Sequence, residues 1–519
     1  MKMYMLKRIL LSLVSFFIVV GTVMVLTYSL IDRTMIFQSD GAWKKYSNNE
    51  KTMYEQRKYE EYGYLTLEEA TDYLKTKYQE TDGEAYISNA QYQAAIAAIK
   101  TTSREENADL AEFKMKYLKD GYKVNYLPQI TSGSKLISSA YLYATKDINV
   151  FVRIFTYFSK MFTFETIYDV DDPNLTDRYI RWEWDKRSNM PALVGSGTTH
   201  KYLIYFDNKF PFIHQNLFHF HLGISNAEYI GSDVADVMVN SQGEIVKTEQ
   251  EYPIDLGTGI THKIGYDFHT ATYNSGELTL AELTMFNDRY TICKTNGDGL
   301  TMLGNSFIMG IIASILAYLF GLPLGVLMAR KKDKIADKIG NVYIILIMAL
   351  PSLAYIFMFS AIGTGLFGLP YKYANAEIKV LAYILPILSL ALPSIGSLMK
   401  WMRRYVIDQQ NCDYVKFAKS QGLSEREVFS THIARNAFIY IVHGIPGTIL
   451  GALTGAIITE RVYGISGVGN LLTNAVTSYD NGVIVACTVF YTALSIISLI
   501  LGDILLTKYD PRISLSGGR

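Results

Sequence analysis

Cysteine is scarce in this chain of 519 residues, which has only Cys293, Cys412 and Cys487. They lie far apart and form no Cys-x-x-Cys pair, which argues against a disulfide framework and a cysteine zinc site. Net charge is also absent, because 49 Lys and Arg balance 49 Asp and Glu. No global field therefore draws the chain to nucleic acid or to an acidic surface. The chain also lacks the GxxxxGK[ST] and HExxH motifs, so it has no signature of ATP hydrolysis or of a zinc protease.

Long apolar runs are what the chain does have. A helix needs about 20 mostly apolar residues to cross a bilayer. Six stretches meet this length, at about 9–31, 302–329, 342–362, 380–399, 438–459 and 482–507. The first is too long for a signal-peptide core and lacks a small-x-small cleavage site, so we interpret it as a retained anchor. The sequence therefore predicts a multi-pass protein of the cell membrane.

Basic residues give this protein an expected orientation. Five Lys and Arg lie between 330 and 338, and seven lie between 400 and 435. The loops after the third and fifth stretches hold only Lys372 and Lys379, and Arg461, respectively. Loops rich in Lys and Arg stay in the cytoplasm, so both termini are expected inside and residues 32–300 outside.

The region from 32 to 300 is long enough for one or two folded domains. Its first part has helical periodicity, as in the segments 65–80 and 88–122, whereas its later part has short alternating runs typical of strands. We therefore expect three parts: a cytoplasmic start and first span (1–31), an extracellular α+β insertion (32–300) and a five-helix core (301–519). Because Cys293 is the only cysteine in the insertion, packing must stabilise it.

Three weak motifs point to catalysis or metal binding. The segment from Gly363 to Gly368 matches GxGxxG but is expected in a short outward loop, without the flanking strand of a nucleotide site. Ser132 and Lys135 match SxxK without the KTG partner of penicillin-binding enzymes. His219 and His221, with His214 nearby, have no carboxylate or thiolate at ligand spacing in the sequence. We predict no catalytic, metal or cofactor site in this chain.

The basic segment within about 405–436 predicts two helices joined by a sharp elbow. Asp413 places an acid at the positive end of the first helix, and Gly422 supplies a left-handed stop. The spacing of Ser424 and Glu427 is that of a capping box at the start of the second. Such an elbow can dock in a groove of a soluble partner, although an amphipathic loop resting on lipid headgroups fits these residues equally well. A DNA-reading helix-turn-helix is improbable so close to a membrane. The residues that we expect to carry the elbow's function are Asp413, Tyr414, Phe417, Ala418, Gly422, Leu423, Ser424 and Glu427.

The apolar stretches also carry features suited to packing or movement. Gly447, Gly451 and Gly455 form a GxxxGxxxG pattern, and Gly321 and Gly325 a shorter one, which allow helices to approach closely. Ordinary bundle packing explains them better than gating does. Acids in a membrane usually face a cavity, so Glu460 is a candidate for lining a hydrated path.

The elbow segment 413–425, with sequence DYVKFAKSQGLSE, resembles the EAA loop of binding-protein-dependent ABC importers, in the form found in oligopeptide and dipeptide permeases. The resemblance continues in HIARNA (432–437), in ERVYGISGVGNLL (460–472), in YDPRI (509–513) and in HLGIS (221–225). By its architecture the large insertion resembles that of the enlarged permease subunits of Gram-positive oligopeptide systems. Tyr440 and Ser466 replace family prolines. The first should leave the start of the fifth span straighter, and the second makes the outward loop's geometry harder to infer.

This resemblance implies a fold, a function and a set of partners. The fold is an α-helical polytopic membrane protein with six transmembrane helices of the ABC importer permease type and a large extracellular α+β insertion. The function is that of a non-enzymatic permease subunit forming half of the path for oligopeptides, while dipeptides and other solutes stay open. In the family the elbow contacts a separate ATPase, and the resemblance implies the same contact here. Ala418 would allow close approach and Gly422 would form the bend. Asp413 and Glu427 would stabilise the two helix starts. Glu460, Gly467 and Gly469 are candidates for the path.

The expected partners are a second homologous permease, two cytoplasmic ATPases that bind ATP and Mg²⁺, a lipid-anchored surface protein that binds peptides, and membrane lipid, but no nucleic acid. An alternative function is a membrane-anchored receptor or surface enzyme whose extracellular domain is the active part. That alternative predicts dispensable inner loops and a convergent polar site outside.

Overall fold

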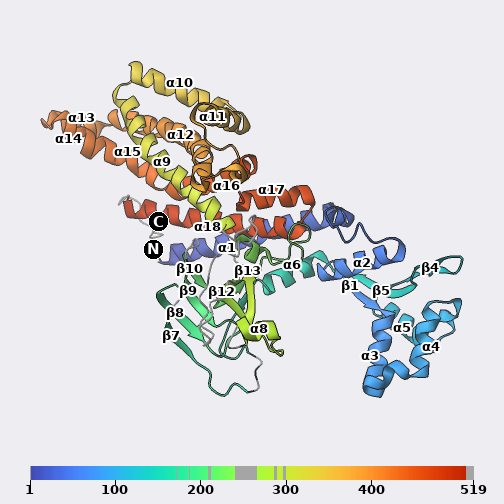
Figure 1. The fold of residues 1–519 in the computed structure, drawn as a ribbon. Coiled ribbons are helices and arrows are strands. Elements are labelled where there is room, and N and C mark those ends of the chain that lie inside the picture. The colour runs from blue at the N-terminus through green and yellow to red at the C-terminus, as the bar shows by residue number, and fades with distance from the viewer. Residues whose placement is uncertain are drawn as a thin grey trace.

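The computed structural model describes residues 2–170, 172, 174–185, 188–207, 212–239, 266–285, 289–295 and 300–509. Figure 1 shows a helical bundle made by the C-terminal half of the chain, with the N-terminal helix α1 (Lys2–Leu30) beside the C-terminal helix α18 (Asn481–Tyr509). The elements between α1 and the bundle form a separate mixed region of helices and strands. The described residues thus comprise a long N-terminal helix, a large α+β region and a C-terminal helical bundle, and the expected domain bounds stay a prediction.

Four helices of the described chain are long and apolar enough to cross a membrane. Besides α1 and α18 they are α9 (Met302–Arg330) and α12 (Ile384–Gln410). The helix α12 continues beyond the predicted end at 399, because the charged segment that follows extends the helix toward the elbow. Pro323 and Pro393 lie inside α9 and α12, where neighbouring helices can compensate for the backbone hydrogen bonds that a proline removes.

The predicted third span is not one straight helix. The structure divides it into α10 (Ile335–Ala349) and α11 (Ser352–Phe367), which meet at an angle of 113°. Pro351 causes the break, because a proline disfavours helical backbone in the residue before it. Leu350 accordingly has an extended backbone with ψ of 133°. The expectation of a continuous helix over 342–362 is therefore wrong.

The predicted fifth span is also divided, into α15 (Arg435–Val442) and α16 (Ile445–Tyr463), with a bend of 47°. Tyr440, which replaces a family proline, lies in regular helix, but the start of this span is not the straighter one that was expected. The bend follows at His443 and Gly444, just before Pro446 in the first turn of α16. Sequence periodicity missed a further helix, α17 (Val468–Ser478), which precedes α18.

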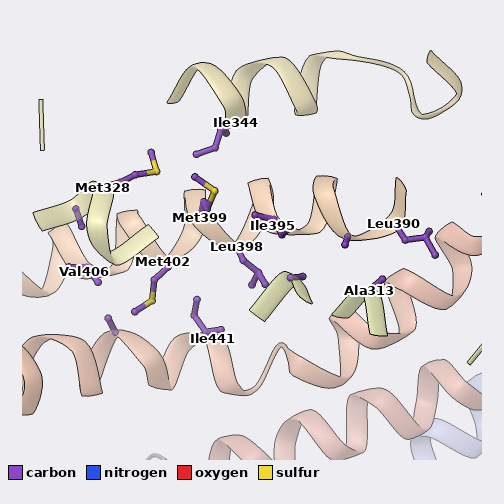
Figure 2. Close-up of a cluster of buried hydrophobic side chains, with 14 of the residues drawn as sticks. Ala313, Met328, Ile344, Leu390, Ile395, Leu398, Met399, Met402, Val406 and Ile441 are labelled. Carbon is purple, nitrogen blue, oxygen red and sulfur yellow. The ribbon is translucent and has the colours of Figure 1, made fainter. Parts of the chain in front are cut away.

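The bundle core is built on close packing of α9 against α12. A Cβ added to Gly321 would lie 2.8 Å from the Cβ of Leu398, and one added to Gly325 would lie 2.8 Å from that of Met402. The shorter glycine pattern therefore allows close helix contact, as predicted. Figure 2 shows α12 side chains at the centre of this core, between Ile344 of α10 and Ile441 of α15. In α16, by contrast, a Cβ at Gly447 or Gly451 would meet nothing within 4 Å.

The first part of the insertion packs helices on a three-stranded antiparallel sheet. The strands are in the order β1 (Leu65–Glu69), β5 (Tyr141–Asp147) and β2 (Lys123–Leu127). The segment 65–69 was expected to be helical, but alternate burial of Leu65, Leu67 and Glu69 suits its pairing with β5. The remaining elements are α2 (Asn48–Glu61), α3 (Ala70–Asp82), α4 (Ala90–Ile99), α5 (Ala108–Lys119) and the hairpin strands β3 (Ile130–Ser132) and β4 (Lys135–Ser138).

The second part of the insertion follows α6 (Val150–Ser159) and consists mainly of strands. One sheet has the order β10 (Ile213–Gln215), β9 (Tyr202–Phe206), β8 (Met190–Gly195) and β7 (Ile180–Asp185). Two ribbons accompany it, β6 (Phe162–Phe164) with β11 (Phe218–Phe220), and β12 (Tyr266–Tyr273) with β13 (Tyr290–Thr295). Two short helices complete it, α7 (Val234–Val239) and α8 (Leu280–Met285). The expected order of helices first and strands later is present.

Candidate functional site

The predicted elbow is formed by two short helices at the end of α12. The first is α13 (Asp413–Ser420), and the second is α14 (Glu425–Glu427). Gly422 lies between them with φ of +82°, in the left-handed region that favours glycine. Figure 1 shows α13 and α14 together at one end of the bundle. We call residues 413–427 the elbow.

Both helix starts of the elbow have the predicted local chemistry. Ser424 Oγ accepts a hydrogen bond from Glu427 N at 3.3 Å, and the Glu427 carboxylate accepts one from Ser424 N at 3.0 Å. This arrangement is a capping box, which satisfies two backbone donors of α14. Asp413 is in the first turn of α13, where the Lys416 ammonium at 2.8 Å lowers the pKa of its carboxyl.

The elbow presents some apolar side chains outward and others inward. Phe417 is 63% exposed and Leu423 is 39% exposed, so both are available to a binding partner. Val415 and Ala418 are instead buried, in the same cluster as Val428. We expected Ala418 to allow close approach of a partner, and we revise this role, because its methyl group packs inside the chain. Phe417 and Ala418 therefore do not share one exposed face.

Tyr414 connects the elbow to the helices on either side of it. Its hydroxyl contacts the Gln409 side chain at the end of α12 and donates to the carbonyl of His432 at 3.2 Å. Asn436 Nδ2, in α15, donates to the same hydroxyl at 3.1 Å and to the His432 carbonyl at 2.8 Å. One phenol thus joins α12, α13 and α15. The sequence contained this signal in the HIARNA segment, but neither His432 nor Asn436 was predicted as a site residue.

A π-helix, η6 (Val428–Ala434), connects the elbow to α15. Such wide turns are rare and occur often at functional sites. The guanidinium carbon of Arg330, at the end of α9, lies 4.8 Å from the centre of the Phe429 ring. The π-helix that follows the elbow is therefore in contact with α9, through an interaction that no residue spacing predicts.

At the other end of the bundle, Glu460 supports the segment of residues 464–469, which we call the outer glycine loop because the sequence predicts that it faces outward. The Glu460 side chain is completely buried in this chain. Its carboxylate accepts hydrogen bonds from Ser306 Oγ of α9 at 2.7 Å and from Asn470 N at 2.9 Å. Ser306 Oγ in turn accepts from Val468 N at 3.0 Å. Glu460 therefore connects α16, α9 and the start of α17.

The two glycines predicted with Glu460 pack against it. A Cβ at Gly467 would lie 2.3 Å from Glu460 Cδ, and one at Gly469 would lie 2.5 Å from the Cα of Ile457. Any side chain there would displace α16 or the carboxylate. Ser466 replaces a family proline in this loop. Its backbone carbonyl accepts a hydrogen bond from Asn305 Nδ2 at 2.6 Å, and a proline at this position would offer the same carbonyl. The place of Glu460, Gly467 and Gly469 along a path stays a prediction.

A second buried carboxylate joins the insertion to the last helix. Asp480, just before α18, accepts hydrogen bonds from Ser225 Oγ at 2.5 Å, Asn226 N at 3.0 Å and Ala227 N at 2.9 Å. The site is tight, because a Cβ at Gly482 would lie 1.9 Å from the carbonyl oxygen of Ile224. The HLGIS segment (221–225), which resembles a family motif, is thus held against the C-terminal helix of the bundle. Sequence reasoning did not single out Asp480.

Two of the weak catalytic motifs have structural explanations. Gly363 and Gly365 lie inside α11, and Gly368 ends it with φ of +63°, so the GxGxxG match is a helix end and not the loop that was expected. Ser132 and Lys135 are opposite each other in the β3–β4 hairpin, beside Gly133 at its turn. The YDPRI segment extends beyond the described residues from 510 onward.

Comparison with known proteins agrees with this arrangement. The family "binding-protein-dependent transport system inner membrane component" matches residues 321–515, which include the elbow and the outer glycine loop. The chain is 32% identical, over the full length of both proteins, to "oligopeptide transport system permease protein AmiC" of two strains of Streptococcus pneumoniae. It is 27% identical to "dipeptide transport system permease protein DppB" of Lactococcus lactis, over 43% of this chain and 74% of that one.

A solved structure of the methionine ABC transporter MetNI aligns with 40% of this chain and with 93% of the matched MetNI chain. The sequence identity is 12% and the TM-score is 0.33, which is too low to support an argument. The full-length identity decides the assignment. The fold and the two ends of the bundle define an integral membrane permease component. The chain belongs to the family of binding-protein-dependent transport system inner membrane components, and its insertion is shared with the AmiC proteins, which confirms the sequence-based resemblance.

Proposed function

We propose that this chain is the permease subunit that forms one half of the translocation pathway of a peptide ABC importer. A second homologous permease forms the other half, two cytoplasmic ATPases bind ATP and Mg²⁺, and a lipid-anchored surface protein delivers oligopeptides. The full-length similarity to oligopeptide permeases supports the substrate class. This chain itself binds no nucleotide or metal for transport, and it is not an enzyme.

The proposed topology has six spans, with each bent helix pair counted as one crossing. Both termini and the elbow lie in the cytoplasm, and the insertion lies outside. The concentration of Lys and Arg near the elbow supports this orientation, because basic loops remain inside. The elbow and the outer glycine loop then face opposite sides of the membrane, which is what a subunit that couples ATP hydrolysis to outward access requires.

The elbow is the single observation that carries the proposal. Its exposed tip offers Phe417 and Leu423 to a groove of a soluble partner, and Tyr414 fixes its base to α12 and α15. A displacement of the tip therefore moves long helices of the bundle and not only a loop. In this mechanism Asp413 and Glu427 stabilise the helix starts, Gly422 sets the bend, and Ala418 packs the elbow onto the bundle.

Site-specific cross-linking tests the contact. In a Cys412→Ser background, Phe417→Cys should form a disulfide or short bifunctional cross-link to a co-expressed ATPase subunit, in a yield that changes with bound nucleotide. Val476→Cys is the matched control, because Val476 is similarly exposed (55%) but lies in α17 near the other end of the bundle. Equal cross-linking at both positions, or labelling of Phe417→Cys by lipid-soluble probes alone, would contradict the proposal.

The insertion is proposed to receive the binding protein or to shield the transfer of peptide from it. Its firm attachment to α18 through Asp480 supports a fixed docking position. Deletion of about 65–147 removes the first sheet with α3, α4 and α5 but leaves α2 and Ser225 in place. Loss of binding-protein capture with normal membrane insertion is the expected result. Unchanged capture and unchanged uptake would leave this region without such a role.

A further inference from the structure

Three potential metal ligands from distant parts of the insertion meet at one point. Glu165 directly follows β6, His200 precedes β9, and His219 lies in β11. One ligand atom of each, a carboxylate oxygen or an imidazole nitrogen, lies within 4.8 Å of those of the other two. His219 had been weighed as a metal ligand and set aside because no carboxylate is near it in the sequence. The structure supplies that carboxylate from Glu165.

The three side chains are already held in mutual contact. Glu165 Oε1 lies 2.8 Å from His219 Nε2 and also contacts His200 Nδ1, while Glu165 Oε2 accepts a hydrogen bond from the backbone N of His200 at 3.0 Å. The side chains of Glu165, His200 and His219 are 7%, 11% and 27% exposed. The pair of inner ligands is thus nearly enclosed, and His219 leaves one open side.

Glu165 is thus a buried carboxylate held between two imidazole rings. A bound metal ion would replace its hydrogen bonds to the two rings, because each imidazole must then direct a lone pair toward the ion.

We propose that Glu165, His200 and His219 bind a transition-metal ion of the Zn²⁺ class. Two imidazole nitrogens and one carboxylate oxygen form a donor set that suits zinc and does not suit Mg²⁺ or Ca²⁺, which require a shell of oxygen ligands. The ligand atoms of a tetrahedral zinc ion lie roughly 3.3 Å apart. Glu165 Oε1 and His219 Nε2, which are 2.8 Å apart, would therefore need to separate by only about half an ångström. The exposed side of His219 leaves the fourth position to water.

Such an ion would cross-link two separate layers of the insertion. Glu165 and His219 belong to the β6–β11 ribbon, and His200 belongs to the connection between β8 and β9 of the larger sheet. Between 32 and 300 the sequence has only one cysteine, so this region has no internal disulfide available. A metal bridge provides the equivalent constraint, and it is independent of the proposed transport function.

Zinc binding by the full-length, untagged chain in detergent or nanodiscs tests the proposal. After chelation and dialysis, we expect the wild-type chain to take up one equivalent of Zn²⁺, and its Co²⁺ form to show the strong visible absorption of a tetrahedral site. Glu165→Gln and His219→Ala should each weaken Zn²⁺ binding by at least about tenfold. His443→Ala is the control, because this exposed histidine lies between α15 and α16, far along the chain from the insertion. Mg²⁺ and Ca²⁺ should not raise the melting temperature.

The proposal would be overturned if the wild-type chain retained no more zinc than Glu165→Gln, or if His443→Ala weakened zinc binding as much as the ligand variants do. Because Glu165 also holds two histidines in place, its loss can disturb the fold. His219→Ala removes only the most exposed ligand, and circular dichroism with size-exclusion chromatography identifies variants that remain folded. Folded His219→Ala with wild-type zinc affinity would reduce the cluster to a hydrogen-bonded structural contact.

Discussion

The side-chain amide of Asn436 donates a hydrogen bond to the hydroxyl of Tyr414 at 3.1 Å, across 22 positions of the chain. This bond joins the first helix of the elbow to α15, which continues through a bend into α16. The same hydroxyl donates to the carbonyl of His432. The elbow is therefore a supported part of the bundle, so a partner that binds it as proposed would act on α12 and α15 together.

Tyr414→Phe tests this support by removing only one oxygen. A lost hydrogen bond in a partly buried network costs about 1 kcal/mol, so the chain should still fold and insert. We expect transport to fall several-fold relative to ATP hydrolysis in reconstituted vesicles, because the elbow moves without its helices. Tyr440→Phe is the control, since Tyr440 is 51% exposed. Equal ratios of transport to hydrolysis in both variants would contradict a connecting role for Tyr414.

Gly422 is expected to tolerate only residues that adopt left-handed backbone. Its φ is +82°, and a Cβ there would meet nothing within 4 Å, so the penalty comes from the backbone and not from crowding. Gly422→Val should abolish uptake and co-purification of the ATPase while membrane insertion continues. Gly422→Asn should retain most activity, because asparagine adopts this conformation more readily.

The control for Gly422 is Gly365→Val in α11, another glycine whose added Cβ would meet nothing within 4 Å but whose backbone is helical. Wild-type uptake by Gly422→Val would remove the bend from the mechanism. Loss of uptake by Gly365→Val to the same extent would show a general effect of valine in membrane helices.

Gly467→Ala should disrupt the outer glycine loop through direct crowding. The added methyl group would lie 2.3 Å from Glu460 Cδ. The Glu460 side chain cannot easily move away, because it is fully buried and its carboxylate accepts a hydrogen bond from Ser306. We expect a lower melting temperature and loss of uptake. Gly21→Ala in α1, where a Cβ would meet nothing within 4 Å, should behave as wild type. A double variant, Gly467→Ala with Glu460→Ala, should recover part of the lost stability if crowding is the cause.

Asp480→Asn should loosen the insertion from the bundle. The amide that replaces one carboxylate oxygen no longer accepts the hydrogen bonds of Ser225 and the following backbone, and an unmatched buried polar group costs about 1–3 kcal/mol. Limited proteolysis of the insertion should become faster, whereas Asp408→Asn, at a side chain that is 60% exposed, should have little effect. Unchanged proteolysis in Asp480→Asn would show that other contacts suffice.

The pH dependence of stability reports on Glu165 in the metal-free chain. Its pKa is lowered to about 2 in the folded protein from an ordinary value of 4.5. A group with a lowered folded pKa stabilises the fold above its unfolded pKa, and this stability is lost as the pH falls toward the folded value. The melting temperature should therefore fall more steeply from pH 5 to pH 3 (about the range between the two pKa values) in wild type than in Glu165→Gln. If the melting temperatures of the two chains changed in parallel with pH, the Glu165 carboxylate would not be ionised and stabilising in the folded chain.

The elbow was predictable from sequence because its causes are local. Gly422, Ser424 and Glu427 are close enough in the chain for spacing alone to specify a turn and a capping box. The outward or inward direction of Phe417 and Ala418 was not predictable, because it depends on the cluster that includes Val428. The 113° break in the third span follows from Pro351, but hydropathy counts only composition and so reported one continuous span.

Contacts over long separations account for most of what sequence reasoning missed. Glu165 is 35 positions from His200 and 54 from His219, and no motif relates such residues. The strand at 65–69 illustrates the same limit, because its partner β5 begins at Tyr141. Segments with helical propensity become strands when a distant edge offers them hydrogen bonds.

The bond between Ser225 and Asp480 spans 255 positions, so it also orders events during synthesis. The ribosome completes the insertion long before it makes the residue that holds HLGIS in place. Until Asp480 is made, the insertion meets the bundle where α6 contacts α1 and α7 contacts α9, but the buried hydrogen bonds at Ser225 are missing. A chain truncated before Asp480 would therefore leave HLGIS unanchored, which gives quality control a segment by which to recognise an unfinished protein.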